Sequence, residues 1–295
     1  MDHFAAIDIG SNAVRLFVGY VHEESGNNFI KKVTLTRVPL RLGEEVFSKG
    51  FISEEKIKQF ELTMHGFRYL MKAYKVIDYR ACATSAMREA ENGDDVRSML
   101  HKNTGIDIEI IDGDQEADLI FSSFFSNDIP RDRSYLFIDV GGGSTELTIL
   151  RNGKRVGSRS FKIGTLRLLK DKVKSDIWEQ ISEWIDINAL SFGPLDGIGS
   201  GGNINKIFKL MEKRQDDYIH VNELEGMARY LNSMTVEERM DKLQLKPDRA
   251  DVIAPASEIY LSVMRMAQIK RVFVPKSGLA DGIVYQLSQK HLQRS

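Results

Sequence analysis

An internal repeat is the feature that most constrains the fold of this chain. The stretch FAAIDIGSNAVRLFV at 4–18 aligns without a gap with YLFIDVGGGSTELTI at 135–149, so that Asp8 falls on Asp139 and Gly10 on Gly141. Each copy reads as an apolar strand, an acid, a glycine turn and a second strand. Because aspartate is a poor strand residue, its recurrence at the same place favours a duplicated domain over two unrelated hairpins.

The remaining pattern predicts an α/β fold with mixed sheets, because strands alternate with amphipathic helices. The length of 295 residues fits two domains. Predicted strands lie at 4–9, 14–21, 30–38, 78–84, 106–111 and 271–275, with a turn at 26–28. One predicted helix begins after a Ser53 cap. Others span 114–125, 175–189, 203–213, 222–232 and 254–268, and a last one starts at about 280. A capping box is predicted at 235–238. The polar stretch 126–133 is the best linker.

Three glycine turns, each after an apolar strand, are suited to binding an anion. Successive backbone N–H groups form a concave nest, and glycine lets a ligand approach the backbone without a Cβ in the way. The turns are Gly10-Ser11-Asn12, Gly141-Gly142-Gly143-Ser144, and a third that carries Gly199, Gly201 and Gly202 ahead of a helix. That helix would add its N-terminal dipole. A plain turn remains the alternative for any one of them.

Two acids flank the second glycine turn. Asp139 ends the first strand and Glu146 lies just past the turn, so both carboxylates can approach the same space. Carboxylates are the usual protein ligands for Mg²⁺, which neutralises charge on a transferring phosphoryl group. A turn-stabilising role for Asp139 and a solvated strand position for Glu146 are the alternatives left open.

Composition excludes several classes of protein. Lys and Arg number 41 against 42 Asp and Glu, so no basic excess marks a general nucleic-acid binder. The single cysteine, Cys82, permits no intramolecular disulfide, and its apolar surroundings predict a packed core thiol in a reducing, cytoplasmic setting. The sequence shows neither a secretory signal nor an apolar run of about 20 residues, so neither export nor membrane insertion is predicted. The six histidines lack zinc-ligand spacing.

These features belong to a longer series of motifs that resembles the Ppx/GppA family of exopolyphosphatases and guanosine pentaphosphate phosphohydrolases, within the actin-like ATPase superfamily. The motifs follow the family's order: AAIDIGSNAVR at 5–15, LGE at 42–44, ATSAMREAEN at 83–92, GDQEA at 113–117, DVGGGSTEL at 139–147, IGSGGN at 198–203, RADV at 249–252 and SGLADG at 277–282. Each motif alone is unspecific, and the ordered combination is highly specific.

The resemblance implies two actin-like, ribonuclease H-like domains with mixed sheets flanked by helices and an active site in the cleft between them. The first would span 1–125, with the last helix, about 278–295, packing back on it, and the second 126–277. The implied activity is Mg²⁺-dependent release of terminal phosphate from polyphosphate or guanosine pentaphosphate (pppGpp), with Mn²⁺ as a substitute metal. A homodimer is left open.

Residue roles carry over by motif. Glu116 resembles the catalytic base that activates water for in-line attack. Asp139, Glu146 and Asp8 would be the acids on the metal side. The resemblance assigns the remaining site residues to phosphoryl or substrate contacts: Gly10, Ser11, Asn12, Arg15, Arg88, Gly141, Gly142, Gly143, Ser144, Thr145, Gly201, Gly202 and Asn203, with Lys162, Thr165 and Arg167 as further contributors.

The chain departs from the family's usual pattern at a few positions. Gln115 stands where the family often has Glu, and Asn203 where it has Thr; Glu45 replaces a frequent glycine and would add negative charge near the substrate. Two other functions stay open. One is an ATP-dependent kinase of the same superfamily, and the other is a non-catalytic sensor that binds an alarmone such as guanosine tetraphosphate.

Overall fold

The computed structural model describes residues 2–24, 27–124, 130, 133–189, 193–214, 216–275 and 278–293. The chain divides into two compact units. The first unit comprises Met1–Ile129 and Ser277–Ser295, and the second comprises Pro130–Lys276. Part of the predicted linker, 126–129 and 131–132, lies outside the described residues.

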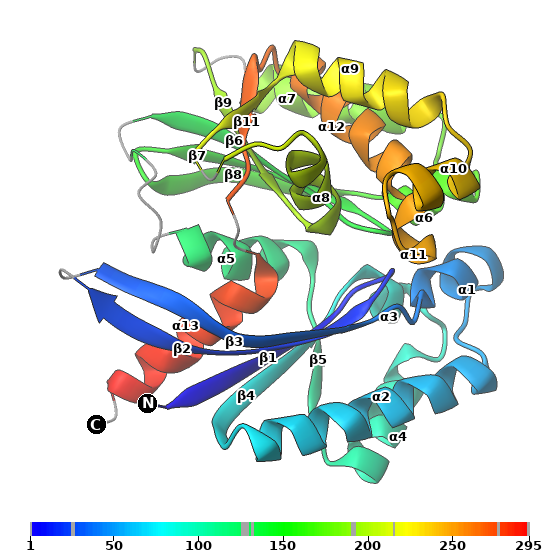
Figure 1. Cartoon of the computed structure of the whole chain (residues 1–295), viewed down its shortest axis with the longest axis vertical. Coiled ribbons are helices and arrows are strands. Elements are labelled where there is room, and N and C mark those ends of the chain that lie inside the picture. Colours follow the sequence, from blue (N-terminus) through cyan, green and yellow to red (C-terminus); the bar gives the residue numbers. More distant parts are fainter. Residues whose placement is uncertain are drawn as a thin grey trace. The chain divides into compact units, whose positions relative to one another are not determined.

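The first unit is a five-stranded mixed sheet with helices on both sides (Figure 1). Its strands are β1 (His3–Ile9), β2 (Val14–Glu24), β3 (Asn27–Val38), β4 (Val76–Ala83) and β5 (Ile108–Ile110), in the order β3-β2-β1-β4-β5. Its helices are α1 (Leu42–Lys49), α2 (Glu54–Ala73), α3 (Ser85–Glu89), α4 (Gly93–Thr104), α5 (Gly113–Phe124) and α13 (Leu279–Leu292). β1 pairs antiparallel with β2 and parallel with β4.

Helix packing in this unit follows from sequence period and from one glycine. α2 buries Phe60, Met64 and Phe67 at helical spacing, and the side chain of Ser53 accepts a hydrogen bond from the Lys56 N–H at its start. α13 packs closely against α5 at Gly282, where only a glycine fits, since a Cβ there would lie 1.7 Å from the Leu119 carbonyl oxygen. Figure 1 shows α5 and α13 on one side of the sheet and α2 and α4 on the other.

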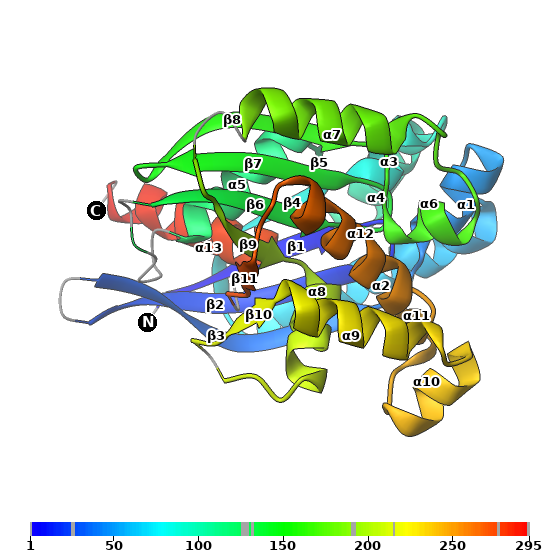
Figure 2. The same ribbon diagram turned by 90° about the horizontal axis from the view of Figure 1, so that it is seen from above.

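The second unit is built on a six-stranded mixed sheet in the order β10-β11-β9-β6-β7-β8. Its strands are β6 (Ser134–Val140), β7 (Thr145–Arg151), β8 (Lys154–Phe161), β9 (Asp196–Ser200), β10 (Tyr218–His220) and β11 (Arg271–Phe273). Its helices are α6 (Thr165–Leu169), α7 (Ile177–Asn188), α8 (Gly202–Leu210), α9 (Val221–Asn232), α10 (Val236–Lys242), α11 (Pro247–Ala250) and α12 (Ile253–Met266). Figure 2 shows α7, α9 and α12 over the same face of this sheet.

The predicted elements with long periodic patterns are confirmed, including the Ser53 cap and the capping box at Thr235 and Glu238. Other predictions need correction. Asn27 and Asn28 belong to β3 rather than to a turn, β4 starts two residues earlier than predicted, and β5 is limited to Ile108–Ile110. The edge strand β10 and the short helices α1, α3, α6 and α11 were not predicted, because elements this short show too little periodicity. The edge strand β8 was missed because its sequence, KRVGSRSF, is mostly polar and exposed and lacks an apolar alternation.

Candidate active site

The first glycine turn lies between β1 and β2 and is fixed by the start of α1. The Gly10 N–H donates to the Ala13 carbonyl at 3.1 Å, which closes the turn. The carbonyls of Ser11 and Asn12 accept hydrogen bonds from Gly43 at 2.9 Å and Arg41 at 3.1 Å. Because the C=O and N–H of one trans peptide point in opposite directions, the next N–H groups along the chain point away from α1.

The second glycine turn repeats this construction between β6 and β7. The Gly141 N–H donates to the Ser144 carbonyl at 2.9 Å, at the position that corresponds to Gly10 and Ala13. The two copies of the internal repeat therefore share an equivalent hydrogen bond in addition to a similar sequence. The Gly141 carbonyl accepts from Thr165 at 3.0 Å and the Gly142 carbonyl from Leu166 at 2.8 Å, both at the start of α6.

α6 thus sets the direction of the second turn's amides. Arg167 is buried and donates its Nε–H to the Gly143 carbonyl at 2.6 Å. With the carbonyls of all three glycines directed at α6, the N–H groups of Gly142, Gly143 and Ser144 point the other way, which is the arrangement of an anion nest. Through this bond, Arg167 fixes the turn on the side opposite to its N–H groups. Thr145 is also structural, since its hydroxyl donates to the Ile163 carbonyl at 2.7 Å.

The two hairpins differ at the residue that faces the aspartate. In the first, Asp8 lies directly across from Arg15, and the two side chains form an ion pair. In the second, Asp139 lies directly across from Glu146, and a carboxylate oxygen of each lies within 4.8 Å of the other. Two carboxylates this close repel each other unless a cation or proton sits beside them. Glu146 is only 2% exposed.

Ser160 on β8 orients Glu146. Its hydroxyl donates to Glu146 Oε1 at 2.8 Å, and the two residues are register partners across the strand pair. Hydrogen bonds of this kind hold a carboxylate in one rotamer and are typical second-layer contacts of metal ligands. The pair of Asp139 and Glu146, with Ser160 behind it, offers hard oxygen donors of the kind that bind Mg²⁺.

The third glycine turn lies against Asp139. Gly201 has φ of 101°, a left-handed conformation that favours glycine, and a Cβ there would lie 2.9 Å from Asp139 Oδ1. α8 begins at the next residue, so its first amides lie near this carboxylate. Arg249, from α11, lies over Gly202 and donates from Nη1 to Asn203 Oδ1 at 2.9 Å. The N-cap of α8 is Gly201, so Asn203 does not cap the helix; its side chain instead holds the Arg249 guanidinium beside the helix N-terminus.

Tyr260 joins the ends of two strands beside this site. It is fully buried on α12, its hydroxyl donates to the Ser200 carbonyl, and the Val140 N–H donates to the same hydroxyl at 3.4 Å. Burial raises the pKa of Tyr260 well above its usual value, and the negative charge of Asp139 adds to the shift. The neutral hydroxyl fixes the end of β6, and so the backbone that carries Asp139.

In the first unit, Glu116 lies in the first turn of α5. The Asp112 carboxylate accepts the Gln115 N–H at 2.8 Å, and the Gln115 side-chain oxygen accepts the Asp112 N–H at 3.0 Å. This reciprocal cap explains the Gln115 departure, because a neutral amide makes the bond as well as a carboxylate does. Burial raises the pKa of Cys82 to about 12; the positive charge of Arg80 opposes the shift, and the negative charges of Glu109, Asp8 and Glu116 add to it.

The other predicted phosphate contacts of this unit are engaged in local bonds. Arg88, on α3, donates from Nη1 to the Ile111 carbonyl at 2.6 Å. The Ser11 and Ser85 hydroxyls lie 2.9 Å apart and bond to each other, which ties the first glycine turn to the start of α3. The predicted thiol is confirmed as a packed one, because Cys82 is fully buried.

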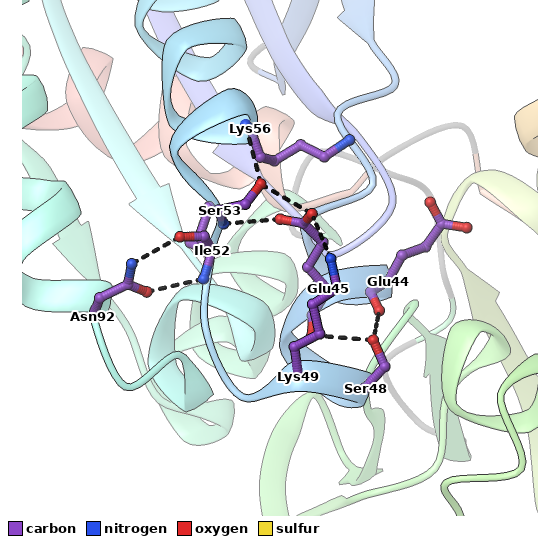
Figure 3. Close-up of polar contacts among 8 residues, drawn as sticks. All are labelled: Glu44, Glu45, Ser48, Lys49, Ile52, Ser53, Lys56 and Asn92. Atoms are coloured by element: carbon purple, nitrogen blue, oxygen red, sulfur yellow. Dashed lines mark hydrogen bonds and ion pairs between the residues drawn. The ribbon is translucent and has the colours of Figure 1, made fainter.

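Glu45 has a local structural role. Figure 3 shows its carboxylate accepting hydrogen bonds from the Ser53 N–H at 2.9 Å and the Ser53 hydroxyl at 3.0 Å, with Lys49 Nζ at 3.3 Å. Burial raises the pKa of Glu45, but the bonds from Ser53 and Lys49 outweigh it and leave the pKa below its usual value. Its charge is balanced where α1 meets α2, which removes the reason for expecting it to act on the substrate.

Sequence reasoning missed three residues of the site. Arg249 stood in a quoted motif, RADV at 249–252, but received no role. Ser160 is recognisable only once β8 is known to pair with β7. Tyr260 left no signal, since it lies within an apolar helix pattern. In the part of the chain that the structure describes, none of the helices is long and apolar enough to cross a membrane.

Known proteins are similar in sequence to most of the chain. A bifunctional 3-dehydroquinate synthase/phosphatase from Fusobacterium nucleatum is 27% identical over 88% of the chain, which spans 43% of that protein. Exopolyphosphatase 1 from Mycobacterium tuberculosis is 24% identical over 94% of the chain and 86% of the relative. Guanosine-5'-triphosphate,3'-diphosphate pyrophosphatase from Photobacterium profundum is 24% identical over 97% of the chain and 59% of the relative.

Solved structures agree on the fold. The crystal structure of an exopolyphosphatase from Cytophaga hutchinsonii superposes with a TM-score of 0.84 over 98% of both chains, at 23% sequence identity. The two predicted α/β units, each with a mixed sheet flanked by helices, are thus confirmed, and the fold is that of this exopolyphosphatase. The Ppx/GppA phosphatase family matches residues 21–184, more than half of the chain, and the chain belongs to this family.

Proposed function

We propose that this protein is a Mg²⁺-dependent hydrolase that releases terminal phosphate from inorganic polyphosphate or from pppGpp. The observation that carries the proposal is the exchange of Arg15 for Glu146 between two otherwise equivalent hairpins. The first hairpin neutralises its own aspartate, whereas the second presents two carboxylates beside an anion nest. A cation and a phosphate together satisfy both halves of that second hairpin.

Asp139 and Glu146 would hold the metal. Two protein carboxylates suit Mg²⁺, which keeps several waters and takes further ligands from substrate phosphates. When bound, the ion would neutralise negative charge on the phosphoryl group. The amides of Gly142, Gly143 and Ser144 would bind the phosphoryl oxygens, and their fixed direction requires no reorganisation during the reaction.

Glu116 would be the general base. We propose that Glu116 takes the proton from the water that attacks the phosphoryl group held beside Asp139 and Glu146. The water oxygen would attack the terminal phosphorus as its proton passes to the Glu116 carboxylate, and the bridging oxygen would leave with the electrons of the broken P–O bond. Arg15 and Arg88 would contact phosphoryl oxygens from the first domain, where paired N–H donors stabilise developing charge.

Mutation of the base tests this reaction. Glu116→Gln keeps the shape of the side chain but cannot accept the proton, so phosphate release should fall by about 10²–10⁴-fold. Asp114→Asn, a change of the same kind in the same helical turn, should retain activity within a few-fold. Phosphate release from polyphosphate and from pppGpp would be measured side by side, with and without Mg²⁺. Unchanged release by Glu116→Gln would overturn its assignment as the base.

The same assay separates the two other functions. A kinase of the superfamily would consume ATP only when a second substrate is present. An alarmone sensor would bind guanosine tetraphosphate tightly and release no phosphate over hours. The relatives named exopolyphosphatase and guanosine pentaphosphate pyrophosphatase support the hydrolase over both, and the two-substrate comparison would rank polyphosphate against pppGpp.

A further inference from the structure

Arg239 is a buried cation to which the proposed reaction gives no role. It lies on α10, where it is only 8% exposed. Burial lowers the pKa of its guanidinium, and the negative charge of Asp251 opposes this shift. Arginine keeps its proton in such surroundings, so the second unit carries a positive charge in its interior. Because a buried charge is costly unless good hydrogen bonds satisfy it, the contacts of this side chain should explain its presence.

Two hydrogen bonds connect Arg239 to carbonyl oxygens at the ends of two helices. Its Nε–H donates at 2.8 Å to Leu231, in the last turn of α9, and its Nη1 donates at 2.9 Å to Ala250, the last residue of α11. Carbonyls at a helix C-terminus lack partners within the helix and carry partial negative charge. A single planar guanidinium therefore joins the end of α9 to the end of α11.

α11 needs such support because it is too short to keep its own direction. It comprises only Pro247–Ala250, and a single turn of helix is unstable by itself. Arg239, in contrast, lies on a helix with a well-defined start. The capping box of Thr235 and Glu238 begins α10, and the Arg239 N–H donates to the Thr235 carbonyl at 3.0 Å. Arg239 thus fixes the C-terminal end of α11 from a firmly held position.

Arg249 is the residue immediately before the carbonyl group that Arg239 binds. Its guanidinium lies over Gly202, where an added Cβ would be 2.7 Å from Nη1, and Nη1 donates to Asn203 Oδ1 at 2.9 Å. α11 is therefore the element that carries the Arg249 guanidinium to the third glycine turn. A shift at the end of this one-turn helix would move the guanidinium with it.

Positive charge gathers where Arg249 meets α8. Burial lowers the pKa of Lys206, on α8, and the positive charges of Lys209 and Arg249 add to this shift. Gathered cations and the N-terminal amides of a helix both favour an anion. The strength of that attraction depends on where the Arg249 guanidinium is held.

We propose that Arg239 is a positioning residue, which holds α11 so that Arg249 stays over the third glycine turn. The inference rests on the proposed function, since it takes the anion at this turn to be a phosphate of the substrate. Arg239 itself touches no substrate and acts through Arg249. The fold offers a second route from Arg239, because α12 follows α11 and carries Tyr260. The test must therefore separate the two routes.

Removal of the two bonds should weaken phosphate binding. Arg239→Met keeps the length of the side chain but donates to neither carbonyl. Its affinity for inorganic triphosphate, measured by isothermal titration without Mg²⁺, should fall about 10-fold. In the phosphate-release assay the loss should appear as a higher KM, with kcat within a few-fold of wild type. Arg68→Met is the matched control, since Arg68 donates at 2.7 Å to the Thr104 carbonyl at the end of α4. It should bind triphosphate as wild type does.

A double-mutant cycle decides whether Arg239 acts through Arg249. Arg239→Met should cost no further affinity in an Arg249→Met background, whereas the effects of Arg239→Met and Tyr260→Phe should add. Arg239→Lys keeps the charge but cannot bridge two carbonyls, so it should show most of the loss, and it carries the same cycle where Arg239→Met does not fold.

Three outcomes would overturn the inference. They are wild-type affinity in both Arg239 variants, a full further loss in the Arg249→Met background, and a wild-type chain that binds no triphosphate. A lower thermal midpoint with unchanged affinity would show that Arg239 only stabilises the fold. The binding measurement requires no turnover, so these outcomes are distinguishable from a failure of the proposed hydrolase, which the release of phosphate tests.

Discussion

At the scale of single residues, one position separates the two hairpins chemically. Arg15 and Glu146 occupy equivalent places across from equivalent aspartates. A charge reversal there replaces an ion pair with two facing carboxylates, an arrangement that could bind a cation. The duplicated scaffold thus supplies two glycine turns from one pattern, whereas a single side chain decides which of them favours a metal.

Loss of the Ser160 hydroxyl should weaken binding of Mg²⁺ at the proposed site. In Ser160→Ala, Glu146 loses the bond that fixes its rotamer, and Mg²⁺ affinity should fall by about 10-fold. Isothermal titration with Mg²⁺ would measure it. The control is Ser158→Ala, which removes a hydroxyl from the same strand that bonds Thr148 at 3.0 Å instead. Equal affinities in the two variants would argue against a metal at Glu146.

Cys82 should be inert in the folded protein. Burial raises the pKa of its thiol to about 12, and the side chain is fully covered. Almost none of it is thiolate near neutral pH, and the thiolate is the reactive form. A disulfide-exchange reagent should therefore modify no thiol in buffer and one per chain in denaturant. Fast modification of the native protein would show that this part of the sheet opens.

At the scale of elements, the short helix α6 determines the shape of the second turn. Gly164 precedes it with an extended φ of −153°, which any residue can adopt, so its glycine is required by space rather than by conformation. A Cβ at Gly164 would lie 2.5 Å from the Gly142 carbonyl oxygen and 2.6 Å from the Gly143 nitrogen. The helix start and the glycine turn are therefore in direct backbone contact.

Gly164→Ala should disturb the nest. Alanine there must push the turn away, at a cost of about 1–3 kcal/mol in the free energy of unfolding, and phosphate release should fall with it. Gly157→Ala is the control, since a Cβ there meets Trp184 only at an ordinary 3.9 Å. Urea unfolding and phosphate release would be measured on both. Wild-type behaviour of Gly164→Ala would mean that the turn tolerates displacement.

At the scale of the whole molecule, the chain returns to its first unit through α13. Asp281 caps this helix by accepting the Gly278 N–H at 2.9 Å, and Gly282 sets it against α5. Burial raises the pKa of Asp281 to about 6 from a usual 3.8, although the Gly278 bond opposes the shift. The last helix of the fold is therefore capped by an acid whose ionisation is disfavoured by burial.

This acid makes stability depend on pH with a defined sign. Because the folded pKa lies above the unfolded one, the folded state holds more protons between pH 4 and 6, and stability falls as pH rises through that window, by at most about 3 kcal/mol. Asp281→Asn keeps an acceptor oxygen but cannot ionise. It should match wild type near pH 4 and exceed it in unfolding free energy at pH 7.5.

Urea titrations across that range would show the difference as a gap that opens between pH 4 and 6. Glu238→Gln is a useful comparison, because Glu238 caps α10 at an exposed position and bonds from Lys242 and Thr235 lower its pKa. It should give no gain at neutral pH. Parallel curves for Asp281→Asn and wild type would show that Asp281 is not the group that titrates.

Sequence patterns by themselves determined the long elements and the repeat. Apolar residues recur about every 3.6 residues along α2, which predicts its buried face. The strand, acid and glycine turn of the hairpin recur in both copies. Both signals can be read from the sequence because they involve residues close together in the chain. The motifs that resemble the family also occur in the family's order along the chain. The predicted contacts to phosphate, metal and water rest on that resemblance.

Tertiary structure alone decided which groups those turns face. Ser160 reaches Glu146 through the pairing of β8 with β7, and Arg249 contacts Gly202 although 46 residues separate them in the sequence. Tyr260 connects strands that are distant in sequence. Such contacts depend on strand register and on helix ends meeting in space, which no local period encodes. The repeat determined that there are two glycine turns, and the packing of α1 and α6 against their carbonyls determined where the amides point.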